Sequence, residues 1–180
     1  MLHLVRTGTP STHAVHLYEE SFPCCERRTL AHHEKLAVEQ DAFFAGELFT
    51  TSETFVGILY FWHWPQHHLL FVEHLAIKPQ LRGLGFGHRA LQLVQKPQTC
   101  VILEIEPVTD AVTARRLSFY TSAGFCRLPQ RHVQLPYHPG GECIPLELLS
   151  WQDSGTPASS SQVLLLEHLL HTRVMLPVRC

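Results

Sequence analysis

A glycine-rich stretch at residues 80–87 is the segment whose residue types and spacing are best suited to bind a ligand. It reads Gln-Leu-Arg-Gly-Leu-Gly-Phe-Gly, with three alternating glycines behind an arginine. An apolar run over 69–77 precedes it, and a helix-like run over 88–95 follows it. Glycine lets the backbone approach a ligand closely, and N–H groups at a helix N-terminus attract anions. The stretch therefore predicts an anion-binding loop between a strand and a helix.

The spacing of the glycines separates this loop from two other phosphate-binding motifs. The dinucleotide fingerprint is Gly-x-Gly-x-x-Gly, and here the third glycine, Gly87, comes one residue too early. The nucleoside-triphosphate loop ends in Gly-Lys-Ser/Thr, whereas His88 and Arg89 follow Gly87. The pattern that fits is Gln/Arg-x-x-Gly-x-Gly, beginning at Gln80 or at Arg82. A tight strand-to-helix turn without a ligand is the alternative.

Composition limits the classes of partner. The chain has 180 residues, enough for one domain with a core, and 45% of them are hydrophobic. Its formal net charge of −2 gives no basic excess for nucleic acid or an anionic membrane. No apolar run approaches the roughly 18 residues of a membrane helix, and residues 1–9 lack the apolar stretch of a signal peptide. Six cysteines without Cys-x-x-Cys pairing predict buried free thiols, so we expect a cytoplasmic protein.

Fourteen histidines make a metal site worth considering. The sequence His32-His33-Glu34 lacks the second histidine of a His-Glu-x-x-His site. The histidines at positions 63, 67 and 68 surround a predicted turn and could supply three ligands. Solvated turn histidines are the alternative, and we expect no metal.

The order of the expected elements predicts a mixed α/β sheet flanked by helices, because an antiparallel meander is followed by alternating strands and helices. The sequence predicts strands over 2–6, 41–50, 54–64, 69–77, 100–106, 126–135 and 142–149, and helices over 12–22, 26–37, 88–95 and 111–122. This domain is expected to span 1–150. A linker and short extension over 151–180 follow, either loosely attached or forming a docking or dimer contact.

A second motif lies one strand and one helix after the glycine loop. Residues 117–125 read Leu-Ser-Phe-Tyr-Thr-Ser-Ala-Gly-Phe, which resembles the Phe-Tyr-x-x-x-Gly-Phe signature of the GCN5-related N-acetyltransferases, the GNAT superfamily. The glycine loop is similar to the acyl-CoA pyrophosphate loop of that family. The resemblance covers about residues 4–150 and implies the GNAT acyl-CoA N-acyltransferase fold, with acetyl-CoA as co-substrate. Thr113 and Arg116 stand where many members carry Asn and Ala, so the CoA contact of that Asn is not carried over.

The resemblance also implies a set of cofactor-binding residues. Backbone amides of the loop and the helix dipole would hold the pyrophosphate, and Arg82 would add a charge-assisted contact. The amides of the CoA arm would pair with the end of the preceding strand. The expected cofactor-binding residues are Leu75, Ala76, Ile77, Arg82, Gly83, Leu84, Gly85, Phe86, Gly87 and Ser118.

Acetyl transfer to an amine requires a proton donor and a proton acceptor. The departing thiolate gains from a general acid, and family position implies Tyr120 for this role. A tyrosine that only packs against the CoA arm is the alternative. An acceptor is needed because a lysine-like amine, with a pKa of about 10.4, is mostly protonated at pH 7.

Glu73 is the expected base. A period of two places Glu73 on the same strand face as the apolar residues Leu69, Phe71, Leu75 and Ile77. Desolvation on this face would raise the pKa of Glu73. The same period places His74 on the other face. A half-exposed glutamate without a role is the alternative.

The acceptor pocket is implied only by family position, between the first two helices and the two hairpins. Its expected lining is Phe22, Glu26, Tyr60, Trp62 and Tyr137, although such aromatics could instead be core. We expect direct acetyl transfer to a primary amine of a small molecule or peptide within a ternary complex, by a monomer or homodimer. The alternative is an acyl-CoA-binding sensor or interaction module without turnover.

Overall fold

The structure is a computed structural model that describes residues 1–138 and 140–174. One seven-stranded sheet has the order β1-β2-β3-β4-β5-β7-β6. The strands are β1 (Leu2–Arg6), β2 (Phe43–Thr50), β3 (Phe55–Trp64), β4 (Leu69–Ile77), β5 (Cys100–Ile105), β6 (Cys126–Gln134) and β7 (Ile144–Trp151). The helices are α1 (Thr12–Ser21), α2 (Leu30–Glu39), α3 (Phe86–Val94), α4 (Ala111–Ser122) and α5 (Ser160–Leu169). The expected mixed α/β sheet flanked by helices is confirmed.

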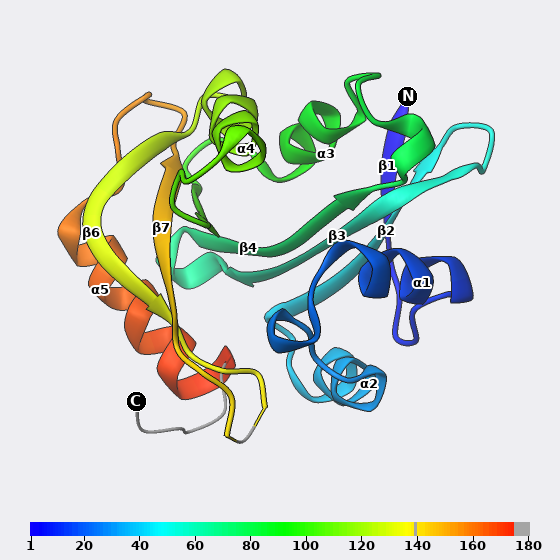
Figure 1. Cartoon of the computed structure of the whole chain (residues 1–180), viewed down its shortest axis with the longest axis horizontal. Helices are drawn as coiled ribbons and strands as arrows, with labels where there is room; N and C mark the ends of the chain where they lie inside the picture. The colour runs from blue at the N-terminus through cyan, green and yellow to red at the C-terminus, as the bar shows by residue number, and fades with distance from the viewer. Residues whose placement is uncertain (139, 175–180) are drawn as a thin grey trace.

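The helices cover the sheet on both faces, as Figure 1 shows. Apolar side chains of α1, α2 and α5 form one core cluster with residues such as Trp62 and Phe71. Apolar side chains of α3 and α4 form a second cluster with residues such as Leu59 and Val101. The central strands are therefore covered on both sides, which explains the nearly continuous apolar sequence of β3.

Strands β4 and β5 are parallel and pair only along part of their length. Their register runs from Leu69 opposite Cys100 to Val72 opposite Leu103. The other neighbouring strands are antiparallel, and β5 continues to pair with β7 as far as Ile105. Beyond Val72 the two parallel strands separate, which leaves an opening at the carboxyl ends of both.

A β-bulge in β4 coincides with this separation. Tyr60 of β3 lies opposite His74, but the next residue, Phe61, lies opposite Val72, so Glu73 is an extra residue in β4. The sequence prediction of uninterrupted alternation is wrong here. Leu75 packs with the α3–α4 cluster, whereas His74 lies on the same side as Glu73.

Local capping explains where the second helix begins. Thr29 accepts a hydrogen bond from the backbone N–H of His32, so α2 starts at Leu30 rather than near residue 26. The preceding residues Cys24–Glu26 form a separate 3-10 turn. This turn brings Glu26 to the opening beyond β4.

The helix nearest the C-terminus, α5, packs against the sheet. Helix α5 begins at a capping box between Ser159 and Gln162. Val163, Leu166 and Leu169 are buried in the same cluster as α1 and α2. Helix α5 is therefore not loosely attached, residues 175–180 of the extension lie outside the described residues, and the division of the chain into domains stays a prediction.

The cysteines differ from the expectation of buried free thiols. Cys24, Cys25, Cys100 and Cys126 are free, but only Cys100 among them is buried. Cys143 forms a disulfide bond, so the expectation was wrong there. Within residues 1–138 and 140–174, no helix is long and apolar enough to cross a membrane.

Candidate active site

The glycine loop presents unsatisfied backbone donors at the start of α3. Gly83 and Gly85 have φ angles of 76° and 78°, which favour glycine because it has no Cβ. Gly85 is the N-cap of α3, and no side chain accepts a hydrogen bond from the first turn. The N–H groups of that turn therefore point outward without a partner in the described chain, which suits an anion.

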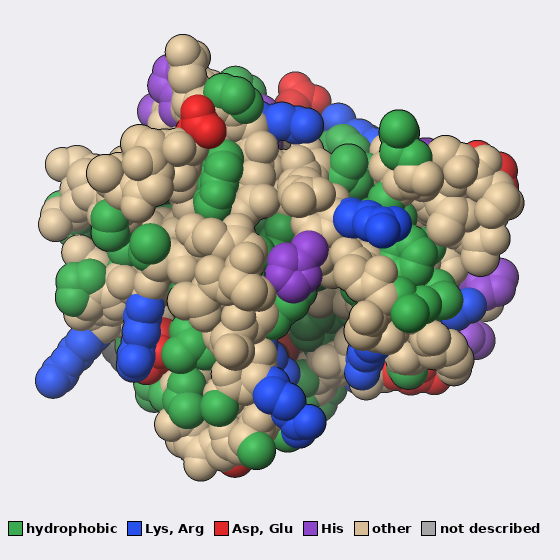
Figure 2. Space-filling model, turned by 90° about the horizontal axis from the view of Figure 1, so that it is seen from above, with side chains coloured by type: hydrophobic (Ala, Val, Ile, Leu, Met, Phe, Trp, Pro, Cys, Tyr) green, Lys and Arg blue, Asp and Glu red, His purple; other side chains and the backbone are tan. Residues whose placement is uncertain are grey.

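A large pocket of about 950 Å³ lies between this loop and α4. Its lining includes Arg82, Arg115 and Arg116, together with apolar groups such as Phe119, and no acidic side chain of the described residues. Figure 2 looks onto the α3–α4 side and shows a hollow with hydrophobic side chains inside and Lys or Arg side chains at its rim. This combination suits a polyanion with an apolar arm. We call this cavity the cofactor pocket, after the ligand that the sequence analysis expects there.

The structure brings most of the predicted cofactor residues to this pocket. Those in its lining are Leu75, Ile77, Arg82, Gly83, Gly85, Phe86 and Gly87. Ala76 lines a neighbouring pocket instead. Leu84 is 59% exposed, Ser118 is also exposed, and neither belongs to the lining.

A second pocket, of about 330 Å³, occupies the opening between β4 and β5, and we call it the acceptor pocket. The predicted substrate residues Phe22, Glu26 and Tyr137 line it. Tyr60 instead lines a separate pocket beside α1 and α2. Trp62 is fully buried in the core, where its side chain contacts Phe43 and Glu73.

The two pockets meet at Tyr120. Both are lined by this tyrosine, and by Arg82 and Arg116. Burial raises the pKa of Tyr120 to about 12, although the nearby Arg116 opposes the shift. The hydroxyl therefore keeps its proton at neutral pH and can donate it where the contents of the two pockets would touch.

Glu73 is surrounded by hydrogen-bond donors. Its Oε1 lies 2.6 Å from Arg28 Nη2 and 3.0 Å from the Tyr137 hydroxyl, and its Oε2 lies 3.2 Å from Trp62 Nε1. Burial alone would raise the pKa of Glu73, but the Arg28 guanidinium outweighs it and lowers the pKa to about 2. The predicted upward shift is wrong. A carboxylate satisfied by these donors is a poor proton acceptor.

Glu26 and His74 lie together in the acceptor pocket. The backbone carbonyl of Glu26 accepts a hydrogen bond from Nε2 of His74 at 2.9 Å, which fixes the tautomer with the proton on Nε2. Burial lowers the pKa of His74, so the ring is neutral. Burial raises the pKa of Glu26, and its half-buried carboxylate has no hydrogen-bond partner in the described part of the chain. This carboxylate is better placed than that of Glu73 to accept a proton.

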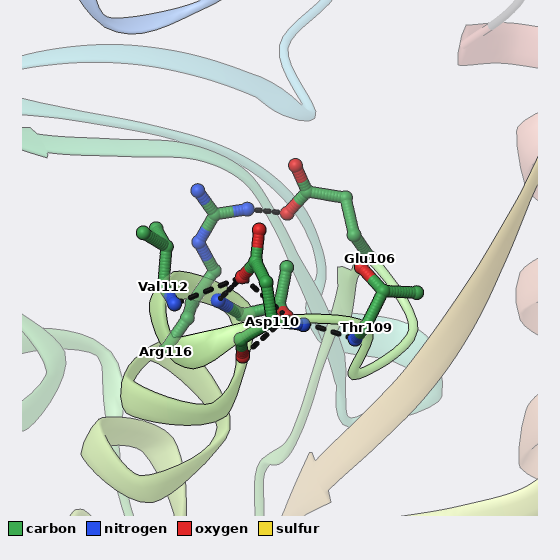
Figure 3. Close-up of polar contacts among 6 residues, drawn as sticks. Glu106, Thr109, Asp110, Val112 and Arg116 are labelled. Carbon is green, nitrogen blue, oxygen red and sulfur yellow. Dashed lines mark hydrogen bonds and ion pairs between the residues drawn. The ribbon is translucent and has the colours of Figure 1, made fainter.

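Figure 3 shows the polar contacts around Arg116, which lines both pockets. Arg116 forms an ion pair with Glu106, which follows β5. Helix α4 starts at a capping box in which Asp110 accepts from the N–H groups of Val112 and Thr113, both at 2.8 Å. The Thr113 side chain is thus used in the cap, and the helix directs Arg116 toward both pockets.

The histidine turn does not gather metal ligands. Among residues 1–138 and 140–174, no group of three or more His, Cys, Asp or Glu side chains could hold a metal ion. His68 adopts a left-handed conformation with φ of 50° at the end of the turn.

Comparison with known proteins gives consistent matches. The sequence model described as "Acetyltransferase (GNAT) family" matches residues 11–125. The Bacillus subtilis (strain 168) protein named "Putative acetyltransferase YjbC" is 27% identical over 155 residues, which are 85% of this chain and 75% of that protein.

Solved structures match over most of their length. A "Putative acetyltransferase from GNAT family" of Bacteroides thetaiotaomicron is 26% identical, with a TM-score of 0.80 over 93% of this chain and 92% of that one. A mutant of the Vibrio cholerae spermidine N-acetyltransferase SpeG is 12% identical, with a TM-score of 0.64 over 85% and 94% of the two chains. The second likeness shows a shared fold alone.

Proposed function

Because the chain belongs to the acetyltransferase (GNAT) family, we propose that it moves an acetyl group from acetyl-CoA directly to a primary amine within a ternary complex. The observation that carries this proposal is the position of Tyr120, which lines both pockets. One pocket has basic and apolar walls that suit CoA, and the other contains carboxylates that suit a cationic amine. Transfer between two bound groups requires such a meeting point.

The cofactor pocket fits the charge of CoA. Unpaired N–H groups at the start of α3 and the helix dipole favour the pyrophosphate, and Arg82 adds a formal charge. Nε of Arg82 donates to the carbonyl of Ile77 at 3.0 Å, so the side chain is held toward the junction. Acetyl-CoA supplies the activated acetyl group.

The acceptor side requires removal of a proton from the amine. We assign this step to the Glu26 carboxylate, acting directly or through a water, because burial outweighs the nearby Arg116 charge and raises its pKa, and no group in the described chain forms a hydrogen bond with it. The N–H of His74 holds the backbone of Glu26 in place. Tyr120 then donates its proton to the departing thiolate.

A thiol-release assay with purified protein, acetyl-CoA and a panel of primary amines tests the function. Release of CoA that depends on the amine, with a product heavier by one acetyl group, is the expected result. Acetyl-CoA binding without release for every amine would instead support a sensor or interaction module. The polyamine spermidine belongs in the panel because it appears in the name of the Vibrio cholerae neighbour.

A further inference from the structure

One part of the acceptor pocket carries polar groups that the proposed transfer does not use. These groups are Glu104 on β5 and Gln134 on β6, which both line the acceptor pocket and are absent from the lining of the cofactor pocket. His132, two residues before Gln134, contacts Glu104. Residues two apart on a strand share a face, so His132 and Gln134 point to the same side of the sheet.

Glu104 is a fixed hydrogen-bond acceptor. Nε2 of His132 lies 2.6 Å from its Oε2, and the two side chains are 5% and 7% exposed. Both strands pair with β7, where Glu104 is opposite Leu148 and His132 is opposite Leu146. The other oxygen, Oε1, has no hydrogen-bond partner among the residues that the structure describes, so it remains able to accept from a ligand.

Gln134 supplies the complementary donor. Gln134 is 5% exposed, and its Nε2 atom is buried without a hydrogen-bond partner within residues 1–138 and 140–174. A buried amide donor without a partner is rare in proteins because its desolvation is not compensated. Since Gln134 lines the pocket, an acceptor atom on the ligand would satisfy it.

We propose that the amine acceptor is an α-amino amide, the chemical group at the amino end of a peptide or of an aminoacyl amide. Its amide N–H would donate to Glu104 Oε1, and its carbonyl would accept from Gln134 Nε2. A polyamine or simple alkyl amine offers donors alone and would leave Gln134 unsatisfied. This inference rests on the proposed N-acetyl transfer and names its substrate class.

The test compares kcat/KM for glycinamide and propylamine in the wild type, in Gln134→Leu and in Glu104→Gln. Gln134→Leu should lower the glycinamide-to-propylamine ratio at least about tenfold, because only the amide uses this contact. The difference in amine basicity cancels in a comparison of ratios between variants. Val133→Ala, on the exposed side of the same strand, is the matched control and should leave the ratio unchanged. An unstructured peptide with a free amino end forms a further arm, which distinguishes peptide termini from small amides.

An unchanged ratio in both Gln134→Leu and Glu104→Gln, with acetyl-CoA binding intact, would overturn the substrate class and leave the proposed acetyl transfer standing. A wild-type preference for spermidine or propylamine over glycinamide, at equal free-base concentration, would do the same. Absence of thiol release with every amine would overturn the substrate class and the proposed function together.

Discussion

Nη2 of Arg28 lies 2.6 Å from Oε1 of Glu73, and neither side chain is exposed. Arg28 comes from the segment between α1 and α2, whereas Glu73 is the bulged residue of β4. Tyr137, from the β6–β7 connection, donates to the same carboxylate, and its ring centre lies 4.6 Å from the Arg28 guanidinium carbon. Three segments distant in sequence are therefore held together beside the acceptor pocket, which Glu73 and Tyr137 line.

We predict that Glu73→Gln destabilises the protein by about 3–5 kcal/mol, because it leaves the Arg28 charge buried without its ionic partner. Urea unfolding measures the change. Glu39→Gln is the control, since it breaks an exposed ion pair of 3.8 Å with Lys35 and should cost less than about 0.5 kcal/mol. A loss for Glu73→Gln no larger than that of the control would contradict a structural role for the pair.

The same ion pair predicts a pH dependence of stability. The folded protein holds the pKa of Glu73 at about 2, below its ordinary value of 4.5. The unfolded chain thus binds a proton first as pH falls, so the stabilisation is complete above about pH 4.5 and is lost toward pH 2. Unfolding free energies measured between pH 5 and pH 2 should fall less steeply in Glu73→Gln than in the wild type. Parallel curves would show that Glu73 does not produce the dependence.

Tyr120→Phe should lower kcat by about 10²-fold or more, because a general acid at the junction is removed, while acetyl-CoA binding is retained. Steady-state thiol release and calorimetric titration measure the two effects. Thr121→Ser, on the exposed side of α4, is the control and should change neither. Unchanged turnover in Tyr120→Phe would remove the tyrosine from the acid role.

Glu26→Gln should lower kcat/KM and abolish the acidic limb of its pH profile. Burial raises the pKa of Glu26, so in the wild type activity should fall as pH drops through that raised pKa and protonates the base. The measurement is kcat/KM against pH for one amine. If the acidic limb persists in Glu26→Gln, the proton acceptor lies elsewhere.

Gly87→Ala should weaken acetyl-CoA binding by crowding the loop. A Cβ at this position would lie 3.0 and 3.1 Å from two ring atoms of Phe119, so the ring or the start of α3 must move. Adding Phe119→Leu should restore part of the affinity, as measured by calorimetry. Gly8→Ala is the control because its Cβ would meet no atom within 4 Å. Equal affinity in Gly87→Ala and the wild type would show that the loop tolerates the shift.

Local sequence was sufficient for the sheet and for the location of the glycine loop and Tyr120 beside one pocket, while their roles stay predictions. The strand Leu69–Ile77 and the helix Ala111–Ser122 have the predicted bounds, because apolar spacing and an Asp110 cap define them locally. Phe22, Glu26 and Tyr137 line one common cavity, as predicted, while its role as the substrate pocket stays a prediction.

What sequence could not supply was contact between distant segments. The prediction of a raised pKa for Glu73 was wrong because Arg28, 45 residues earlier, forms an ion pair with it and lowers that pKa. The predicted orientation of the His74 side chain was wrong because a period of two does not reveal a bulge in the strand. Trp62 was assigned to the pocket although it donates to Glu73 from inside the core.

The bulge of β4 lies where the acceptor pocket opens. Glu73 is the one residue of β4 that has no paired residue in β3. The pairing of β4 with β5 ends at Val72, immediately before it. The opening of the sheet therefore begins next to a single unpaired residue rather than at an inserted loop.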